Sequence, residues 1–366
     1  SCIKDEAPNA EADITGISFE EDVLANSYID LNPSYDESQN AYPIRISVKE
    51  STDMTSLAPI FELTPGATIS PASGSVQNFT TPVRYTVTSE DKAWHRVYAI
   101  TAREQKASNI PTTYHFEKVR IMQNVWQEFY EEQDSGNELT WASGNKGFKW
   151  AMSEAATEDY PTTQIDNGKT GKCVKLETRL TGDLGNMVGM PIAAGNLFIG
   201  SFDMLNAITN PLSATRFGTP FYNKPLRLTG YYKYKAGEQF YENGEYTSRK
   251  DIFNIYAIFY DGVKYDSAGK GTDVTLDGNL PNQNYEHSSM VALALVSNPQ
   301  ETEGDEWKFF DIPFDYQRYG KKIDEARLAK GEYKIGIIFA SSKDGATFEG
   351  APGSTLLIDE VELIYE

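Results

Sequence analysis

Residues 226–235 (LRLTGYYKYK) form a strand-length run rich in tyrosine, bounded by Pro225 and Gly237. Similar runs of β-branched and aromatic residues recur at 252–260, 290–296, 307–314, 333–340 and 355–365. Shorter candidate strands are 148–152 and 197–204, and only 321–328 has the charge and leucine content of a short helix. Because about ten strands follow one another without interleaved helices, residues 112–366 predict two packed antiparallel sheets. This domain begins near the edge where it ends, which favours a β-jelly-roll.

Residues 13–106 have a different sequence pattern, in which short strand-like segments are separated by Pro, Gly, Asn and Ser. The runs at 14–19 and 42–48 alternate apolar and polar residues, as a strand with one buried face requires. About seven short strands without a helical period predict an immunoglobulin-like β-sandwich. The polar segment 107–113 carries a proline and marks the domain boundary. The predicted fold class is therefore all-β, with an N-terminal immunoglobulin-like β-sandwich followed by a larger C-terminal β-jelly-roll.

The balance of charge limits the classes of partner. The chain of 366 residues has a formal net charge of −20, from 33 Lys and Arg against 53 Asp and Glu. Phosphate binding needs clustered Lys and Arg, so neither nucleic acid nor an anionic membrane surface is an expected partner. Aromatic residues are concentrated in the second domain, since 36 of the 45 follow residue 110. Tyr and Trp combine a flat apolar face with a polar edge, which suits both sheet packing and sugar stacking.

The first twelve residues are polar and are interpreted as a tether. Cys2 follows Ser1 and precedes Ile, Lys, Asp and Glu, which resembles a mature bacterial lipoprotein whose cysteine thiol carries the lipid. No apolar run reaches the roughly 18–20 residues that span a bilayer. We therefore expect an outer-membrane lipoprotein, exposed at the cell surface or facing the periplasm, that meets the membrane only through its lipid. Cys173 lies in a strand-like stretch and is expected to be a buried, unreactive thiol.

Standard catalytic motifs are missing from the sequence, which has no G-x-S-x-G elbow, phosphate-binding glycine loop, HExxH or CxxC. Carboxylates are plentiful, so a glycosidase pair of acidic residues stays open as an alternative. Glu177 and Asp203 are the candidates for this catalytic pair because both lie on predicted strands, opposite large apolar neighbours. A solvated sheet face is the other interpretation of both residues.

Two loops combine aromatic side chains with glycine and polar groups. A sugar ring stacks its C–H face on an aromatic plane, while amides and charged groups bind its hydroxyls. Packing beneath a loop is the alternative interpretation of each such residue. The candidate ligand-binding residues are Trp141, Asn145, Trp150, Arg216, Phe217 and Tyr222.

Several of these stretches also resemble a known family. The segments 141–145 (WASGN), 194–200 (AGNLFIG), 225–234 (PLRLTGYYKY), 348–356 (FEGAPGSTL) and 358–363 (IDEVEL) resemble the putative carbohydrate metabolism domain of gut Bacteroidetes lipoproteins. Residues 13–104, with motifs such as 71–74 (PASG), are similar to the Ig-like spacer modules that lead many such lipoproteins. The resemblance implies a jelly-roll similar to carbohydrate-binding modules and some glycoside hydrolases. It implies a role in glycan use and brings no assigned catalytic residue.

Jelly-roll modules that bind carbohydrate often hold a structural calcium ion between their first and last strands, through oxygen ligands. Glu117 opens the second domain and Asp359 closes it, so these two are the candidate metal ligands. A simple carboxylate at a sheet edge is the alternative interpretation. No other cofactor is expected.

The favoured function is an exported lipoprotein that binds or processes extracellular carbohydrate through aromatic and amide side chains. Its expected partners are polysaccharide or oligosaccharide and other surface proteins of glycan utilisation. One alternative is a glycoside hydrolase with an Asp/Glu pair on the concave face of the jelly-roll. The other is a structural or adhesin subunit without a sugar site.

Overall fold

A computed structural model describes residues 7–366, and the chain divides into two compact units. The first unit ends at Ala107, and the second covers Ser108–Tyr365. Strands account for 41% of the chain and helices for 10%, which confirms the predicted all-β class. Cys2, the predicted lipidation site, lies outside the described residues.

The first unit has six strands within the described residues, one fewer than the sequence predicts. They form a two-stranded sheet, β1-β3, and a four-stranded sheet in the order β2-β6-β5-β4, where β2 and β6 run parallel. Period-two alternation buries one face of β2, so that Ile44, Ile46 and Val48 enter the core while Arg45 is exposed. The strands are β1 (Ile14–Ser18), β2 (Tyr42–Val48), β3 (Ile60–Leu63), β4 (Thr68–Ser70), β5 (Val83–Thr88) and β6 (His95–Glu104).

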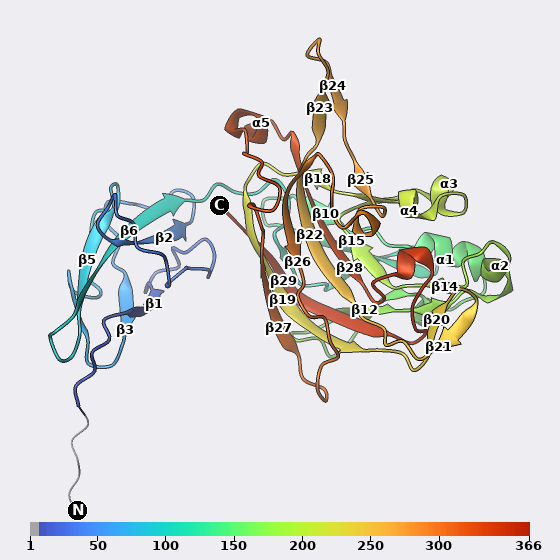
Figure 1. Ribbon diagram of the computed structural model, residues 1–366, viewed down its shortest axis with the longest axis horizontal. Coiled ribbons are helices and arrows are strands. Elements are labelled where there is room, and N and C mark those ends of the chain that lie inside the picture. Colours follow the sequence, from blue (N-terminus) through green and yellow to red (C-terminus); the bar gives the residue numbers. More distant parts are fainter. Residues whose placement is uncertain (1–6) are drawn as a thin grey trace, which may run out of the picture. The chain divides into compact units, whose positions relative to one another are not determined.

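The second unit is built on two antiparallel sheets packed around one core (Figure 1). One sheet has the order β11-β12-β29-β19-β27, and β7 pairs with β29, so the first and last strands of this unit are neighbours. Its strands are β7 (Thr113–Tyr114), β11 (Thr162–Ile165), β12 (Cys173–Glu177), β19 (Pro225–Lys235), β27 (Lys308–Pro313) and β29 (Thr355–Tyr365). The other sheet has the order β15-β28-β22-β26, with β18 paired to β28. Its strands are β15 (Asn196–Phe198), β18 (Thr219–Pro220), β22 (Asn254–Asp261), β26 (Met290–Leu295) and β28 (Tyr333–Ala340).

Strand β22 is buried on both faces, which determines where a site can lie. Ile255 and Phe259 point into the core between the two sheets. Tyr256 and Tyr260 belong to a separate apolar cluster on the opposite face of the same sheet. That cluster includes Phe217 of a small sheet, β16-β17-β25, so the outer face of β22 is covered rather than solvated. The covering strands are β16 (Gly200–Phe202), β17 (Thr215–Phe217) and β25 (Leu276–Asp277).

The remaining elements of the second unit are short. Its other sheets are the three-stranded β8 (Lys118–Met122), β9 (Trp126–Glu132) and β10 (Glu138–Thr140), and the pairs β13 (Arg179–Leu180) with β14 (Ile192–Ala193), β20 (Phe240–Glu242) with β21 (Glu245–Thr247), and β23 (Val263–Tyr265) with β24 (Gly271–Asp273). Its helices are α1 (Asn145–Ala151), α2 (Gly182–Met187), α3 (Met204–Ala207), α4 (Pro211–Ala214) and α5 (Glu325–Ala329), with single 3-10 turns η1 (Thr157–Asp159), η2 (Pro281–Gln283) and η3 (Gly345–Thr347).

Two predicted elements need correction. The predicted strand 148–152 is wrong, because Phe148 N–H donates to Gly144 O and Met152 N–H donates to Phe148 O, which makes this segment part of α1. The predicted strand 197–204 is broken at Ile199, between β15 and β16, and β16 begins at Gly200, where φ is +150°. A Cβ at Gly200 would lie 1.8 Å from Arg216 O, so only glycine permits this close approach between β16 and β17. The predicted helix 321–328 begins later, at Glu325, because the Asp324 carboxylate accepts from Ala326 N and Arg327 N and caps it.

Candidate functional site

Two cavities lie next to each other in the second unit and share part of α1 as a common wall. Phe148 and Ala151, both on this helix, line both cavities. The first cavity, which we call the apolar pocket, has a volume of about 190 Å³. The second, which we call the acidic hollow, is wider, with a volume of about 670 Å³. Because both cavities use this short helix, a ligand that reaches both would contact α1.

The apolar pocket is built on the outer face of the β15-β28-β22 sheet, under the short helices. Its floor includes Tyr256 of β22 and Ile338 of β28, and its walls include residues of α1, α3, α4 and η3. The contacts between α3 and α4 and between α4 and η3 hold these helices together as a cover. The aromatic side chains that line it are Phe148, Trp150, Phe198, Phe202, Phe217, Tyr256 and Phe348.

The acidic hollow holds three carboxylates, Glu154, Asp159 and Glu177, together with Arg179. Glu177 ends β12 and ion-pairs with Arg179 Nη2 at 2.6 Å and with Lys175 Nζ at 3.4 Å. The Glu177 side chain is 16% exposed, so its charge sits at a partly covered surface that opens into the hollow. This arrangement supplies hydrogen-bonding groups of both signs within reach of one ligand.

Trp141 and Asn145 cannot bind a ligand as predicted. Trp141 is 1% exposed and packs edge-to-face on Tyr114, with ring centroids 5.0 Å apart, inside the core between the sheets. Asn145 is fully buried, where its Nδ2 donates to Thr162 O at 2.9 Å and its Oδ1 accepts from Thr162 N at 3.2 Å. Both residues are structural, because no face of either side chain reaches solvent.

The other four predicted ligand-binding residues have different positions. Trp150 is 37% exposed and lines the apolar pocket, and Phe217, although buried, forms part of its wall. Arg216 is exposed on β17 and lines neither cavity. Tyr222 is 42% exposed, and its ring lies against Gly331, beyond the end of α5 rather than at the pocket. Of the six predictions, Trp150 is therefore the one that joins an exposed aromatic face to a cavity.

Glu177 and Asp203 do not line a common cavity. Asp203 is the N-cap of α3, where its Oδ1 accepts from Leu205 N at 3.0 Å and its Oδ2 accepts from Asn206 Nδ2 at 2.6 Å. The hydrogen bond from Asn206 lowers the pKa of Asp203, which disfavours a role as general acid. Asp203 has a structural explanation as a helix cap, whereas Glu177 remains a candidate within the acidic hollow.

A buried carboxylate that the sequence reasoning missed is connected by hydrogen bonds to the walls of both cavities. Asp251 is 3% exposed, and its Oδ2 accepts from Ser342 Oγ at 2.6 Å and from Ser354 Oγ at 2.6 Å. Ser342 lines the apolar pocket, and it bonds Thr178, which lines the acidic hollow, through their hydroxyls at 2.6 Å. Burial raises the pKa of Asp251 in spite of these hydrogen bonds. The network links the walls of the two cavities.

A family model described as a putative carbohydrate metabolism domain matches residues 115–364, which contain both cavities. The chain belongs to this family. A second model, described as the N-terminal domain of SGBP, the surface glycan-binding proteins, matches residues 30–102. These matches support a carbohydrate-related role for the chain. A search of the curated proteins finds no match.

Two solved structures resemble the chain along most of its length. One is a putative glycoside hydrolase from Bacteroides vulgatus ATCC 8482, which is 50% identical, with a TM-score of 0.66, and covers 71% of this chain and 100% of its own. The other is a putative glycoside hydrolase from Bacteroides thetaiotaomicron VPI-5482, which is 45% identical, with a TM-score of 0.63, and covers 99% of both chains. Among residues 7–366, no helix is long and apolar enough to cross a membrane.

The predicted calcium ligands of this family member lie around one loop. Asp359 is fully buried, and its Oδ2 accepts from Thr170 N at 3.0 Å. Glu117 Oε1 accepts from Lys172 N at 2.7 Å, so two carboxylates already hold the loop through its backbone N–H groups. Calcium takes about six to eight oxygen ligands, and residues 7–366 contain no group of three or more His, Cys, Asp or Glu placed to hold a metal. The side chains do not by themselves form a calcium site, and bound calcium stays a prediction.

The pH dependence of stability separates the two interpretations of Asp359. Burial raises its pKa to about 6, so without a bound cation the folded state holds this proton more tightly than the unfolded state. The contribution of Asp359 to stability is full below the unfolded pKa of 3.8 and is lost as the pH rises through about 6. We expect Asp359→Asn to gain stability relative to the wild type on going from acidic to neutral pH in a chelating buffer, measured by urea unfolding. The same series with calcium in place of the chelator separates the interpretations, because a bound calcium ion would favour the ionised carboxylate and reverse this trend.

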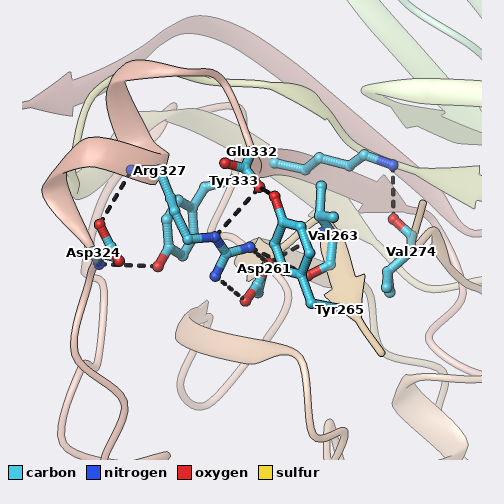
Figure 2. Close-up of polar contacts among 9 residues, drawn as sticks. Asp261, Val263, Tyr265, Val274, Asp324, Arg327, Glu332 and Tyr333 are labelled. Carbon is cyan, nitrogen blue, oxygen red and sulfur yellow. Dashed lines mark hydrogen bonds and ion pairs between the residues drawn. The ribbon is translucent and has the colours of Figure 1, made fainter. Parts of the chain in front are cut away.

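A second group of charged side chains lies at α5, where the side chains form hydrogen bonds and ion pairs with one another (Figure 2). Arg327 donates to the two oxygens of Asp261 at 2.7 and 2.5 Å, and Nη2 also donates to Val263 O at 3.2 Å. Glu332 accepts from the Tyr265 hydroxyl and from Arg327 Nε. These contacts tie the β23-β24 hairpin to α5 through a bidentate ion pair. Because both carboxylates are paired with Arg327, we interpret this cluster as structural.

Proposed function

We propose that the chain is an exported lipoprotein that binds glycan at the cell surface, through the site formed around α1. The observation that carries this proposal is Trp150, whose partly exposed ring lines the apolar pocket and stands on the helix that both cavities share. An aromatic plane beside charged and amide groups is the combination that a sugar ring requires. The glycan would stack on Trp150 and place its hydroxyls among Glu177, Arg179 and Glu154.

The first unit supports the cell-surface part of the proposal. Its match to the N-terminal domain of surface glycan-binding proteins fits a spacer that carries the second unit away from a membrane. Attachment would use a lipid on Cys2, and partners would include other surface proteins of glycan utilisation. Metabolic labelling of the expressed chain with a fatty-acid analogue, with and without Cys2, tests the attachment.

Hydrolysis of the glycan is the second candidate function, favoured by the three carboxylates of the acidic hollow. The similar structures from Bacteroides are described as putative glycoside hydrolases, which adds weight to this alternative. A glycosidase needs two carboxyl groups about 5–5.5 Å apart for retention or about 6.5–9.5 Å apart for inversion. Glu177 with Glu154 or Asp159 would be the pair, because all three line the same hollow.

One titration distinguishes these functions. The purified chain is mixed with a panel of plant, host and microbial glycans, while calorimetry follows binding and chromatography follows product release in the same samples. We expect binding without products. Released sugars would favour the hydrolase, and Glu177→Gln would then be the first variant to test. No binding across the panel would favour a structural or adhesin subunit.

A further inference from the structure

We propose that the apolar pocket binds an aromatic acyl group attached to the glycan as an ester. This inference rests on the proposed function and names its substrate class, which is a glycan decorated with benzoyl-type or cinnamoyl-type esters. The acidic hollow would hold the sugar while the aromatic ring enters the neighbouring pocket, which shares α1 with the hollow. An unsubstituted sugar would leave the pocket unfilled.

The walls of the pocket are suited to an aromatic ring. Phe198 and Phe217 already meet edge-to-face with centroids 5.4 Å apart, and Phe217 meets Tyr256 in the same way at 6.2 Å. A ring inserted beside them can continue this edge-to-face arrangement, which aromatic pairs prefer over face-to-face stacking. A sugar, with hydroxyls around its rim, would leave those hydroxyls unpaired against the same walls.

The size of the pocket also fits one ring. Its volume is about 190 Å³. An engineered apolar cavity of about 150 Å³ in another protein binds benzene. Small residues of the lining, such as Gly147 on α1 and Ala214 on α4, leave this space open. A substituted benzene ring therefore fits, and a polysaccharide chain does not.

One polar group of the pocket explains why an ester is the expected linkage. Asn196 Oδ1 accepts from Gly144 N at 2.7 Å, which fixes the orientation of the side-chain amide. Its Nδ2 has no hydrogen-bond acceptor among residues 7–366 and lies at the pocket wall. An ester carbonyl oxygen is an acceptor that this free N–H can bind.

Charge and surface apolarity around the pocket agree with this ligand. Lys343 is the one charged side chain among the described residues that line it, so a cationic group would find no carboxylate there. Next to the lining residues Val188 and Met204, the exposed side chains of Met187 and Leu205 extend the apolar surface outwards. These side chains are 81% and 91% exposed, which is unusual for isolated apolar residues.

The test uses methyl benzoate as the probe and methyl acetate as its control. The two esters differ only in the group on the acyl carbon, phenyl in one and methyl in the other, so the difference in their binding reports on recognition of the aromatic ring. Binding to the full chain is followed by saturation-transfer NMR and calorimetry. We expect methyl benzoate to bind at least about ten-fold more tightly than methyl acetate.

Two variants test whether the ligand binds in the pocket. Ala346 lines the pocket but is exposed on η3, so Ala346→Trp should fold and block the opening, while Ala268→Trp in the exposed β23-β24 turn is the matched control. Asn196→Asp keeps the acceptor for Gly144 N–H and removes the free donor. We expect both pocket variants to bind methyl benzoate at least about ten-fold more weakly and the control to be unchanged.

The outcomes separate this inference from the proposed function. If glycans without aromatic groups bind the chain and methyl benzoate does not, the inference is wrong and the glycan-binding function stands. If methyl octanoate binds more tightly than methyl benzoate, the pocket takes an acyl chain and the aromatic assignment fails. Equal binding of methyl benzoate to wild type and Ala346→Trp would also overturn it. If no glycan and no ester binds, both proposals are contradicted.

Discussion

Replacement of Asp251 by alanine is expected to lower the free energy of unfolding of the second unit by about 3–5 kcal/mol. Asp251 is 3% exposed, and its two oxygens accept from Ser342 Oγ, Ser354 Oγ, Ala351 N and Ile252 N. The serine hydroxyls can rotate towards other acceptors, but the two backbone N–H groups cannot. A buried donor without an acceptor costs about 1–3 kcal/mol, and the lost side chain also leaves a cavity.

Asp251→Asn is the matched variant for this prediction. It keeps the shape of the side chain and one acceptor oxygen, and the serine hydroxyls can turn to accept from the new amide. A smaller loss than for alanine is therefore expected. Thermal unfolding followed by tryptophan fluorescence is a suitable readout, since four of the five Trp residues follow residue 107. Equal stability of wild type and Asp251→Ala would show that the hydroxyl network contributes nothing.

Trp141→Ala is expected to cost about 3–5 kcal/mol of stability while leaving the glycan affinity of the folded protein unchanged. The ring is almost fully buried and packs against Tyr114, Phe116 and Phe339, with centroids between 5.0 and 6.0 Å away. Truncation would leave a large void between the sheets. Trp141→Phe fills part of that void and should lose less stability. A loss of glycan affinity in the well-folded Trp141→Phe variant would restore Trp141 as a ligand-binding residue.

The positions of the strands could be predicted because the two-residue period of a strand can be recognised in the strand's own sequence. Strand β19 was expected at 226–235 and occurs at Pro225–Lys235, and the last strand occurs at Thr355–Tyr365 as expected. Glycine and proline at their ends fix these limits locally. By contrast, the segment around Phe148 alternates like a strand, and its helical form depends on contacts with residues far along the chain. Asn145, for example, is held by Thr162 of β11.

The site could be predicted only in part, for a related reason. Trp141 and Trp150 have the same chemistry and are nine positions apart, yet one is 1% and the other 37% exposed. Burial is a property of the assembled sheets, so the local sequence gives no sign of which ring is free. Asp251 was missed because its partners Ser342, Ala351 and Ser354 follow it by about ninety to one hundred residues. No sequence motif near Asp251 indicates its role.

The central claim is that glycan binds around α1, and the most direct measurement compares two tryptophan variants. Trp150→Ala removes the exposed ring at the site, while Trp94→Ala removes a ring that is 64% exposed in the first unit. Calorimetry with a glycan that binds the wild type should give at least about ten-fold weaker affinity for Trp150→Ala, which corresponds to a loss of about 1.4 kcal/mol or more of stacking energy. Trp94→Ala should bind as the wild type does. Unchanged binding by Trp150→Ala would contradict the account and place the glycan site elsewhere on the chain.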